Sequence, residues 1–318
     1  MILSGSLLTI AQLVGGFLLL LFGGDWLVDG GVAIARRFRI PTLVIGLTIV
    51  AFGTSAPELL VSTISAIKGS SGIAMGNVLG SNICNIGLIL GLTAMIYPIL
   101  VEDVKPVTAS AIMMIAVSAL LVLLSVNGRL SHLEGAVMFL ILVSYIVYSV
   151  IKGRTGSEPE APEDLSMTMK IVPAILLVIL ACGMLAYGAD LLVDGATSLA
   201  KSLGVSDRII GLTVVAFGTS LPELAASVAA ALKRQMDISI GNIIGSNIFN
   251  ILGVLGLSSA ITPIGFSFSR YGLDFAVMGA FAIALTLMIQ PWKKTGKLSR
   301  LSGLILFLSY AAYAWSLF

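Results

Sequence analysis

Charged side chains are scarce in this chain: Asp, Glu, Lys and Arg make up 11 % of its 318 residues, whereas 58 % are hydrophobic. This number of charged residues is too small to cover the surface of a water-soluble protein of this length. The composition therefore predicts an integral membrane protein. Apolar runs of about 20 residues, enough for a helix to cross the bilayer, recur along the chain. We therefore expect an all-α integral membrane protein.

Side chains that bind soft metals are nearly absent as well. The chain has one histidine, His132, and two cysteines, Cys84 and Cys182, which form no CxxC or similar spacing. These numbers exclude a zinc or copper site built from imidazoles and thiolates, and we expect both cysteines to be packing residues. Because no predicted span offers a histidine in its interior, a membrane-embedded hydrolase of the Ser–His type is also disfavoured, and we expect no enzyme.

The hydrophobic runs predict ten membrane-spanning helices. They cover residues 5–24, 43–67, 72–97, 107–126, 132–151, 170–190, 208–232, 238–262, 272–290 and 300–317. Of the 18 Lys and Arg residues, 13 lie in the connections after the odd-numbered spans. Basic residues mark cytoplasmic connections, so both termini are expected outside the cell membrane, in the extracellular or periplasmic space.

The chain contains an internal repeat. GLTIVAFGTSAPE, Gly46–Glu58, returns as GLTVVAFGTSLPE, Gly211–Glu223, with 11 of 13 positions identical and an offset of 165 residues. The same offset carries GNVLGSNICN at 76–85 onto GNIIGSNIFN at 241–250. Since each copy holds five spans, an odd number, the second copy enters the membrane in the opposite sense to the first.

This inversion predicts the organisation of the chain. We expect a first inverted repeat at 1–151 with its motif at 46–91, a polar cytoplasmic linker at 152–168, and a second repeat at 169–318 with its motif at 211–256. Transporters built this way hold their substrates near the membrane midplane, where the repeats meet.

Each repeat carries a glutamate within an apolar span, Glu58 and Glu223. A carboxylate at the bilayer centre costs at least ~3 kcal/mol, so something must compensate it. The alternative is a protonated carboxyl bonded to a neighbouring helix. Pro57 and Pro222 each directly precede a glutamate, and proline should break the helix there. A broken helix at that depth frees backbone oxygens to bind cations.

Neutral oxygens accompany the two glutamates. Hydroxyls lie within one helical turn of each carboxylate, and Asn85 and Asn250 add amide oxygens one turn after a serine in the following span. Two carboxylates and several neutral oxygens match the six to eight ligands that Ca²⁺ prefers, and suit Mg²⁺ less well. One Ca²⁺ or two Na⁺ would neutralise both glutamates; the asparagines could instead be contacts between helices.

With these motifs the chain resembles the cation/calcium exchanger superfamily, and within it the prokaryotic sodium/calcium exchangers. The resemblance covers essentially the whole chain and implies an antiporter that exchanges Na⁺ for Ca²⁺ by alternating access, with no cofactor besides the transported ions. Carbonyl oxygens of Ala51 and Ala216 are implied as sodium ligands. The complete set of ion ligands it implies is Ala51, Thr54, Ser55, Glu58, Ser81, Asn85, Ala216, Thr219, Ser220, Glu223, Ser246 and Asn250.

Other functions remain open at this stage. A proton-coupled calcium antiporter of the same fold is the first alternative, although such proteins resemble GNxxE rather than GTSxPE at the repeat. A cation channel is a remote alternative, because two inverted halves in one chain are typical of transporters. We expect Ca²⁺, Na⁺ and membrane lipid as partners, with no nucleic acid or protein partner implied. Asp25, Asp29 and their repeats Asp190 and Asp194 are expected to cap spans or form contacts at their ends.

Overall fold

The computed structural model describes residues 2–156, 169–204 and 216–317. Seven helices in these ranges are long and apolar enough to cross a membrane, and the bent pair Thr42–Thr54 and Ala56–Ile67 adds an eighth span. The predicted seventh span, 208–232, and the predicted linker, 152–168, lie partly outside the described residues.

The first half contains a helix or a broken helix at each of the five predicted spans, and α1 extends well beyond its predicted end. Its elements are α1 (Ile2–Phe38), α2 (Thr42–Ile45), η1 (Gly46–Val50), α3 (Ala51–Thr54), α4 (Ala56–Ile67), α5 (Ser71–Cys84), η2 (Asn85–Leu90), α6 (Gly91–Ile96), β1 (Ile99–Val101), α7 (Val104–Ser125), β2 (Arg129–Leu130) and α8 (His132–Gly156).

The second half repeats this order in the residues that are described. Its elements are α9 (Ile171–Ser202), α11 (Ala216–Gly218), α12 (Leu221–Leu232), α13 (Met236–Phe249), η5 (Asn250–Leu255), α14 (Gly256–Ile261), β3 (Ile264–Gly265), η6 (Phe268–Tyr271), α15 (Gly272–Met288), β4 (Gly296–Leu298) and α16 (Arg300–Ser316).

Both glutamate-bearing spans are broken, as predicted. Helix α3 ends at Thr54 and α4 begins at Ala56, with a bend of 48° between the two segments. Ser55 leaves the helical region at φ −87°, ψ 8°, and its counterpart Ser220 does the same at φ −92°, ψ 4°. A proline follows each serine in the first turn of the new helix, where its missing N–H costs nothing.

In the described residues three short π-helical turns occur that were not predicted. They are η1, η2 and η5, and the last two begin at Asn85 and Asn250. A π turn disturbs the regular α-helical bonding pattern, and such turns are frequent at functional sites. Both candidate asparagines therefore stand where their helix changes its winding.

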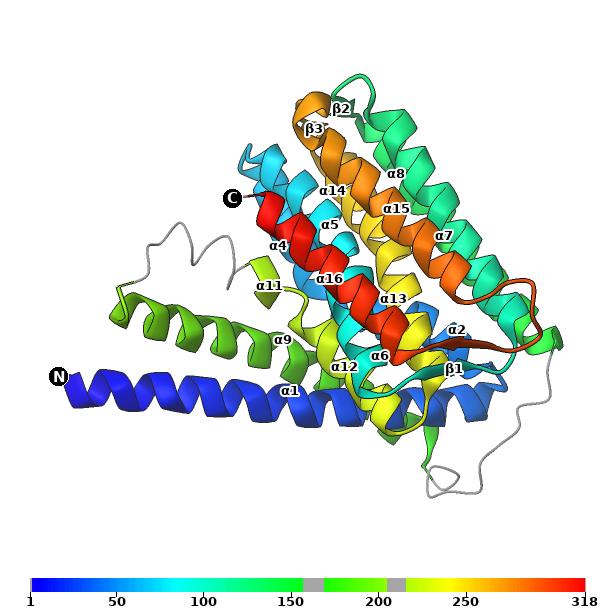
Figure 1. Cartoon of the computed structure of the whole chain (residues 1–318), viewed down its shortest axis with the longest axis horizontal. Helices are drawn as coiled ribbons and strands as arrows, with labels where there is room; N and C mark the ends of the chain where they lie inside the picture. The colour runs from blue at the N-terminus through cyan, green and yellow to red at the C-terminus, as the bar shows by residue number, and fades with distance from the viewer. Residues whose placement is uncertain (1, 157–168, 205–215, 318) are drawn as a thin grey trace.

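Two small antiparallel sheets connect the halves at opposite ends of the bundle (Figure 1). Strand β1 pairs with β4, with Ile99 opposite Leu298, and β2 pairs with β3, with Arg129 opposite Gly265. The first sheet joins the connections after predicted spans 3 and 9, and the second joins those after spans 4 and 8. Each sheet thus joins connections that the inverted topology assigns to one face of the membrane.

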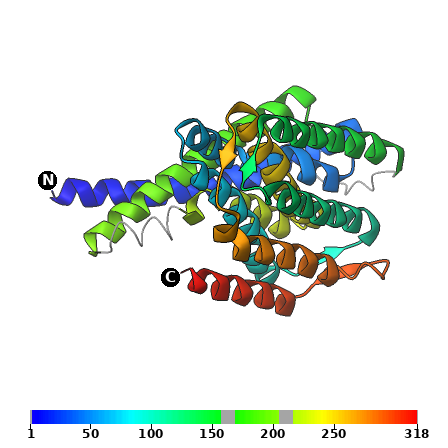
Figure 2. The same cartoon turned by 90° about the horizontal axis from the view of Figure 1, so that it is seen from above.

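Helices α1 and α9 are longer than predicted, with 37 and 32 residues. At 1.5 Å per residue α1 extends about 55 Å, well beyond a ~30 Å hydrocarbon core, which fits its oblique course. The two helices lie side by side and project together from the bundle in both Figure 1 and Figure 2. The expectation that Asp25 and Asp190 lie at span ends was wrong, because each helix continues for about three further turns.

The contact between α1 and α9 is close and antiparallel. A Cβ added to Gly16 would lie 2.7 Å from the carbonyl oxygen of Gly188, and one added to Gly188 would lie 3.0 Å from that of Gly16. Only glycine permits backbones to approach to this distance, as at other membrane helix contacts.

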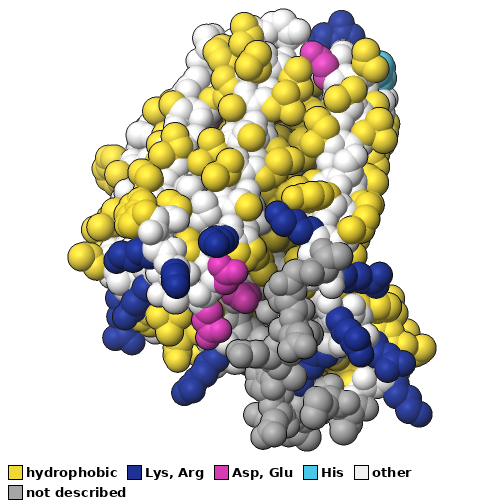
Figure 3. All heavy atoms as spheres, turned by 90° about the vertical axis from the view of Figure 1, so that its right-hand side faces the viewer, with side chains coloured by type: hydrophobic (Ala, Val, Ile, Leu, Met, Phe, Trp, Pro, Cys, Tyr) yellow, Lys and Arg dark blue, Asp and Glu magenta, His cyan; other side chains and the backbone are white. Residues whose placement is uncertain are grey.

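Helix α13 and its continuation occupy the centre of the molecule. The apolar window of Met236–Ile261 is 100 % buried, against 22 % for α1 and 17 % for α8, which therefore lie at the periphery. Figure 3 shows hydrophobic side chains over most of one face, with Lys and Arg gathered toward its lower end. This is the distribution of a surface that lipid covers between two polar boundaries.

Candidate cation site

The two glutamates come together at the centre of the protein. Glu58 and Glu223 stand in the first turns of α4 and α12, and both are fully buried. The hydroxyl Oγ of Ser55 donates to Glu223 Oε1 at 2.8 Å, which links the first repeat to the second. Glu58 lies near Glu223 and near the Thr219 hydroxyl. A helix N-terminus favours negative charge, so each break helps to hold a carboxylate there.

Many polar atoms of the candidate residues are buried without a hydrogen-bond partner. An unpartnered buried polar atom costs about 1–3 kcal/mol, so such atoms are rare unless a ligand or ion satisfies them. In the described part of the chain they include Glu58 Oε1 and Oε2, Asn85 Oδ1 and Nδ2, Thr219 Oγ1, Ser220 Oγ, Glu223 Oε2, Ser246 Oγ and Asn250 Oδ1. All but one are oxygens, the ligand atoms that hard cations prefer.

The amide groups of Asn85 and Asn250 are arranged differently. Asn250 Nδ2 donates to Asn82 Oδ1 at 3.1 Å, which leaves Asn250 Oδ1 free of protein donors. Asn82 in turn donates to the backbone oxygen of Asn247 at 3.2 Å. Asn82 therefore orients the amide of Asn250, whereas both amide atoms of Asn85 lack such a partner.

The remaining candidates lie around this centre. Thr54 is fully buried and, like Ser246, lies near Glu223. The Ala51 carbonyl oxygen accepts from Ser55 N at 3.0 Å and from Thr54 Oγ1 at 3.3 Å, so it is engaged within its own helix.

Ser81 and Ala216 are less well connected to the centre. Ser81 is buried on α5, one turn before Asn85, and among the described residues its hydroxyl bonds to none of the other candidates. Ala216 begins α11, and only its backbone belongs to the described part.

Two further asparagines hold the glutamate helices and were not singled out from the sequence. Asn242 Nδ2 donates to Ser227 Oγ at 2.9 Å and to the Glu223 backbone oxygen at 3.4 Å, while its Oδ1 accepts from Thr54 Oγ1 at 3.2 Å.

The repeat-related Asn77 makes two of these bonds, to Ser62 Oγ at 2.9 Å and to the Glu58 backbone oxygen at 3.3 Å. Each is the second residue of a repeated GN motif, so the repeat itself was the signal that could have found it.

The charge of the centre comes from the two glutamates. Most basic residues of the sequence lie in the connections between spans. In the ranges that the structure describes, neither glutamate forms an ion pair with a Lys or Arg. No group of three or more His, Cys, Asp or Glu side chains that could hold a metal is found there either. A bound cation would thus face two carboxylates surrounded by neutral hydroxyl and amide oxygens.

Comparison with known proteins extends over both repeats. The family model described as "Sodium/calcium exchanger protein" matches residues 8–151 and 173–318. The sodium/calcium exchanger MaX1 of Methanosarcina acetivorans is 32 % identical to this chain, with 95 % of this chain and 96 % of that protein covered. The inner membrane protein YrbG of Escherichia coli is 36 % identical, with 94 % of each covered.

A solved structure of a sodium-calcium exchanger is also similar to this chain over nearly its whole length. The sodium-calcium exchanger NCX_Mj, soaked with Na⁺ and Ca²⁺, superimposes on this chain with a TM-score of 0.84 and 34 % identity. The superposition covers 98 % of this chain and 99 % of that one, so it includes both repeated motifs.

Proposed function

Because this chain belongs to the sodium/calcium exchanger family, we propose that it is a secondary active antiporter that exchanges Na⁺ for Ca²⁺ across the cytoplasmic membrane. The family membership itself makes the chain a multi-pass membrane transporter of the exchanger fold, with ten spans in two repeats, and not an enzyme. The coupling ion, the ligands and the direction of transport are our proposal.

The observation that carries the proposal is the set of buried, unpartnered oxygens around Glu58 and Glu223. Three carboxylate oxygens, two amide oxygens and three hydroxyl oxygens of the candidate residues are buried without protein donors. Ca²⁺ takes six to eight oxygens in flexible geometry, and one Ca²⁺ balances the two carboxylates.

The ligands divide by charge and position. Glu58 and Glu223 bind Ca²⁺ and share Na⁺, with Thr54 and Thr219 beside them and the amide oxygens of Asn85 and Asn250 completing the set. The four serines of the two motifs and the backbone oxygens of the two alanines serve sodium: Ser55, Ser81, Ser220, Ser246, Ala51 and Ala216. Ca²⁺ and Na⁺ thus compete for the same two carboxylates, which couples their movements.

The inverted halves supply alternating access. In this proposal the repeats 1–151 and 169–318 meet around the ions, the linker 152–168 and the odd-numbered connections face the cytoplasm, and both termini face outward. Sodium moving inward down its gradient then drives Ca²⁺ out. Exchange of more than two Na⁺ per Ca²⁺ would carry net charge and respond to the membrane potential.

The test is Ca²⁺ uptake into Na⁺-loaded proteoliposomes on dilution into Na⁺-free buffer. Wild-type protein should take up ⁴⁵Ca²⁺, and Glu58→Gln and Glu223→Gln should abolish uptake because each leaves the centre one charge short. Glu102→Gln, which changes an exposed glutamate in a connection, is the matched control and should transport normally.

A pH gradient in place of the sodium gradient separates the first alternative. Uptake driven only by the pH gradient would identify a proton-coupled exchanger of the same fold. Passive Ca²⁺ flux without any counter-ion gradient would identify a channel. Loss of uptake in Glu102→Gln as well would mean that the assay reports general damage rather than the two central carboxylates.

A further inference from the structure

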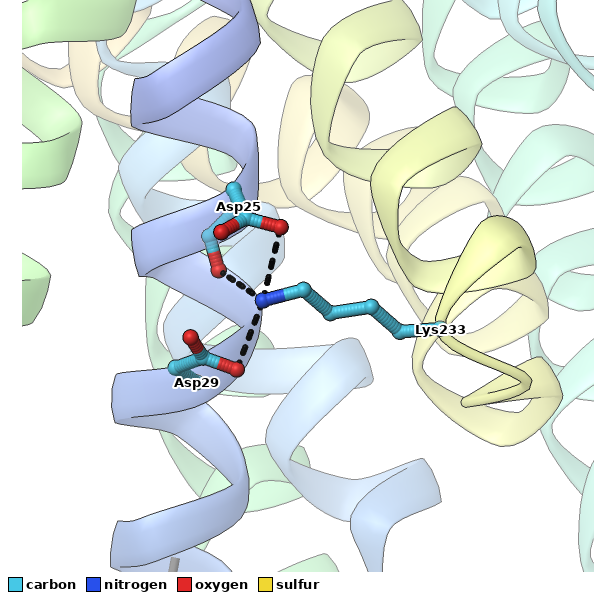
Figure 4. A network of polar contacts seen from close by, with 3 residues as sticks. All are labelled: Asp25, Asp29 and Lys233. Atoms are coloured by element: carbon cyan, nitrogen blue, oxygen red, sulfur yellow. Dashed lines mark hydrogen bonds and ion pairs between the residues drawn. The ribbon is translucent and has the colours of Figure 1, made fainter. Parts of the chain in front are cut away.

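One lysine holds α1 against the end of α12. Lys233 Nζ lies 2.7 Å from Asp25 Oδ1 and 2.7 Å from Asp29 Oδ1, and it also donates to the Asp25 backbone oxygen at 3.0 Å (Figure 4). The two carboxylates stand one turn apart on α1, so a single ammonium group bridges both. The three side chains are half-buried.

The same three residue types recur in the other repeat. Shifting Lys68 by the repeat offset of 165 residues gives Lys233, and the same shift carries Asp25 and Asp29 onto Asp190 and Asp194. In this second set Lys68 follows the C-terminal end of α4, and Asp190 and Asp194 lie on α9. None of these residues contributes to the cation site, so the repeated motifs around the glutamates do not explain them.

The two lysines are presented in the same way. Each directly follows the last residue of its helix, Lys68 at φ −77°, ψ 3° and Lys233 at φ −80°, ψ 6°. Each is followed by a residue in the left-handed region, Gly69 at φ 77° and Arg234 at φ 59°. Both ammonium groups thus sit at a helix C-terminus, where positive charge is favoured.

Among the described residues, only the Lys233 set forms ion pairs within itself. Lys68, Asp190 and Asp194 are all exposed, and among the described residues neither aspartate forms an ion pair or hydrogen bond with Lys68. The same backbone geometry therefore leads to a bridged lysine in one repeat and a separated one in the other.

Helix packing differs between the repeats in the same sense. Helix α1 lies directly on α12, where a Cβ added to Gly24 would be 2.8 Å from the Ala225 carbonyl oxygen. The repeat counterparts of Ala225 and Ala229 are Leu60 and Ile64 on α4, and these are 62 % and 48 % exposed. The side of α4 that corresponds to the α1-covered side of α12 is uncovered.

The two sets lie at opposite ends of the α1–α9 pair. A Cβ on Gly30, next to Asp29, would lie 3.1 Å from the Ala174 oxygen near the start of α9. A Cβ on Gly195, next to Asp194, would lie 2.9 Å from the Leu13 side chain in the first half of α1. Because the pair is antiparallel and crosses the membrane, the two lysine sets face opposite sides of it.

We propose that the two sets are alternating ionic latches that hold α1 and α9 in the two end states of the exchanger. In the state described here Lys233 fastens α1 to α12 on one face. In the opposite state the inverted repeats exchange conformations, Lys233 releases Asp25 and Asp29, and Lys68 fastens α9 to α4 through Asp190 and Asp194. This inference rests on alternating access in the proposed function.

The arrangement has a direct energetic consequence. Each end state keeps one lysine bridged to two carboxylates and leaves the other lysine separated, so the two states have similar latch energies. A single unmatched latch would favour one state throughout the cycle. Two matched latches hold each state against thermal opening without biasing the exchange between them.

Spin-label distances test the proposal without any transport. One pair of labels at Arg37 and Leu232 reports on the Lys233 face, and the repeat-related pair at Ser202 and Ile67 reports on the Lys68 face; all four positions are exposed. The two native cysteines are replaced first. The wild type should show a short distance for the pair on the latched face.

The two lysine variants should shift the populations in opposite directions. Lys233→Gln should lower the population of the state with α1 fastened to α12, relative to the state with α9 fastened to α4, by about two- to fivefold. This is the size expected for partly exposed ion pairs. Lys68→Gln should raise the same ratio by a similar factor. Combining Lys233→Asp with Asp29→Lys reverses the charges and should restore the wild-type ratio.

Each other outcome overturns the latches. Shifts in the same direction, no shift in either variant, or no recovery in the charge-reversed protein would mean that the two lysines do not act as alternating latches. Size-exclusion profiles of all variants check that they fold, and the charge-reversed protein guards against a folding defect. ⁴⁵Ca²⁺ uptake on the same samples keeps the questions separate: opposed distance shifts without sodium-driven uptake would refute the proposed function while leaving the two latched states in place.

Discussion

Asn77 and Asn242, whose side chains bond to the two glutamate helices, lead to a quantitative prediction. Asn242 makes three hydrogen bonds in a fully buried position, whereas Asn77 makes two in a half-buried one. Hydrogen bonds between membrane helices contribute about 0.6 kcal/mol each on average. Asn242→Ala should therefore lower the unfolding free energy by about 2 kcal/mol, and Asn77→Ala by about 1 kcal/mol.

Calcium binding should weaken in the same order. Asn242 holds the backbone at Glu223, and if the whole loss of about 2 kcal/mol falls on the bound state, affinity drops by at most about 30-fold. Thermal unfolding in detergent measures the first effect, and calorimetric Ca²⁺ titration measures the second.

Asn247→Ala is the matched control for this comparison. Asn247 is the same residue type on the same helix and is equally buried, but its side chain donates only to the Ile243 carbonyl oxygen of its own helix, at 2.7 Å. It should leave Ca²⁺ affinity nearly unchanged. The reasoning would be refuted if Asn247→Ala weakened Ca²⁺ binding as much as Asn242→Ala, or if Asn77→Ala had the larger effect.

Three further perturbations follow from the site and its packing. Gly245→Ala should reduce the yield of folded protein, because its Cβ would lie 2.7 Å from the backbone of Leu47; retention of the wild-type size-exclusion peak would contradict this. Asn250→Asp adds a third carboxylate, so Ca²⁺ uptake should be inhibited more strongly as the pH falls from 8 to about 5, and an unchanged pH profile would argue against Asn250 as a ligand. Ca²⁺ at about 100 times its Kd should stabilise the wild type by about 2.7 kcal/mol, and a melting-temperature shift that persists in Glu58→Gln would place the ion elsewhere.

The sequence was sufficient for the class of protein and for the local shape of its repeated segments. Composition and the 165-residue offset predicted a helical membrane protein with two copies of one unit. The breaks before Glu58 and Glu223 were predictable because proline acts on its own turn, whatever surrounds it. The division at 152–168 and the ligand assignments remain predictions, since the described residues do not test them.

Other features escaped the sequence analysis because neighbours far along the chain create them. The π turns at Asn85 and Asn250 had no distinctive local pattern, and the bonds of Asn77 and Asn242 to the glutamate helices were marked only by the repeated GN motif. The lengths of α1 and α9 were underestimated because the predicted spans were bounded by their apolar runs, which end near Asp25 and Asp190. Asp25 lies within α1 and pairs with Lys233, whereas Asp190 is exposed on α9.

The sequence by itself determined that two equivalent sets of residues exist, in the site and at each end of the α1–α9 pair, because a repeat copies local chemistry. Only the tertiary structure decided how each set is used. Ser55 bonds across the repeat to Glu223, and in the described part of the chain Lys233 is bridged to its aspartates while Lys68 is not. Two copies of the same residues have the same local preferences, so their difference arises from the packing of one conformation of the whole chain.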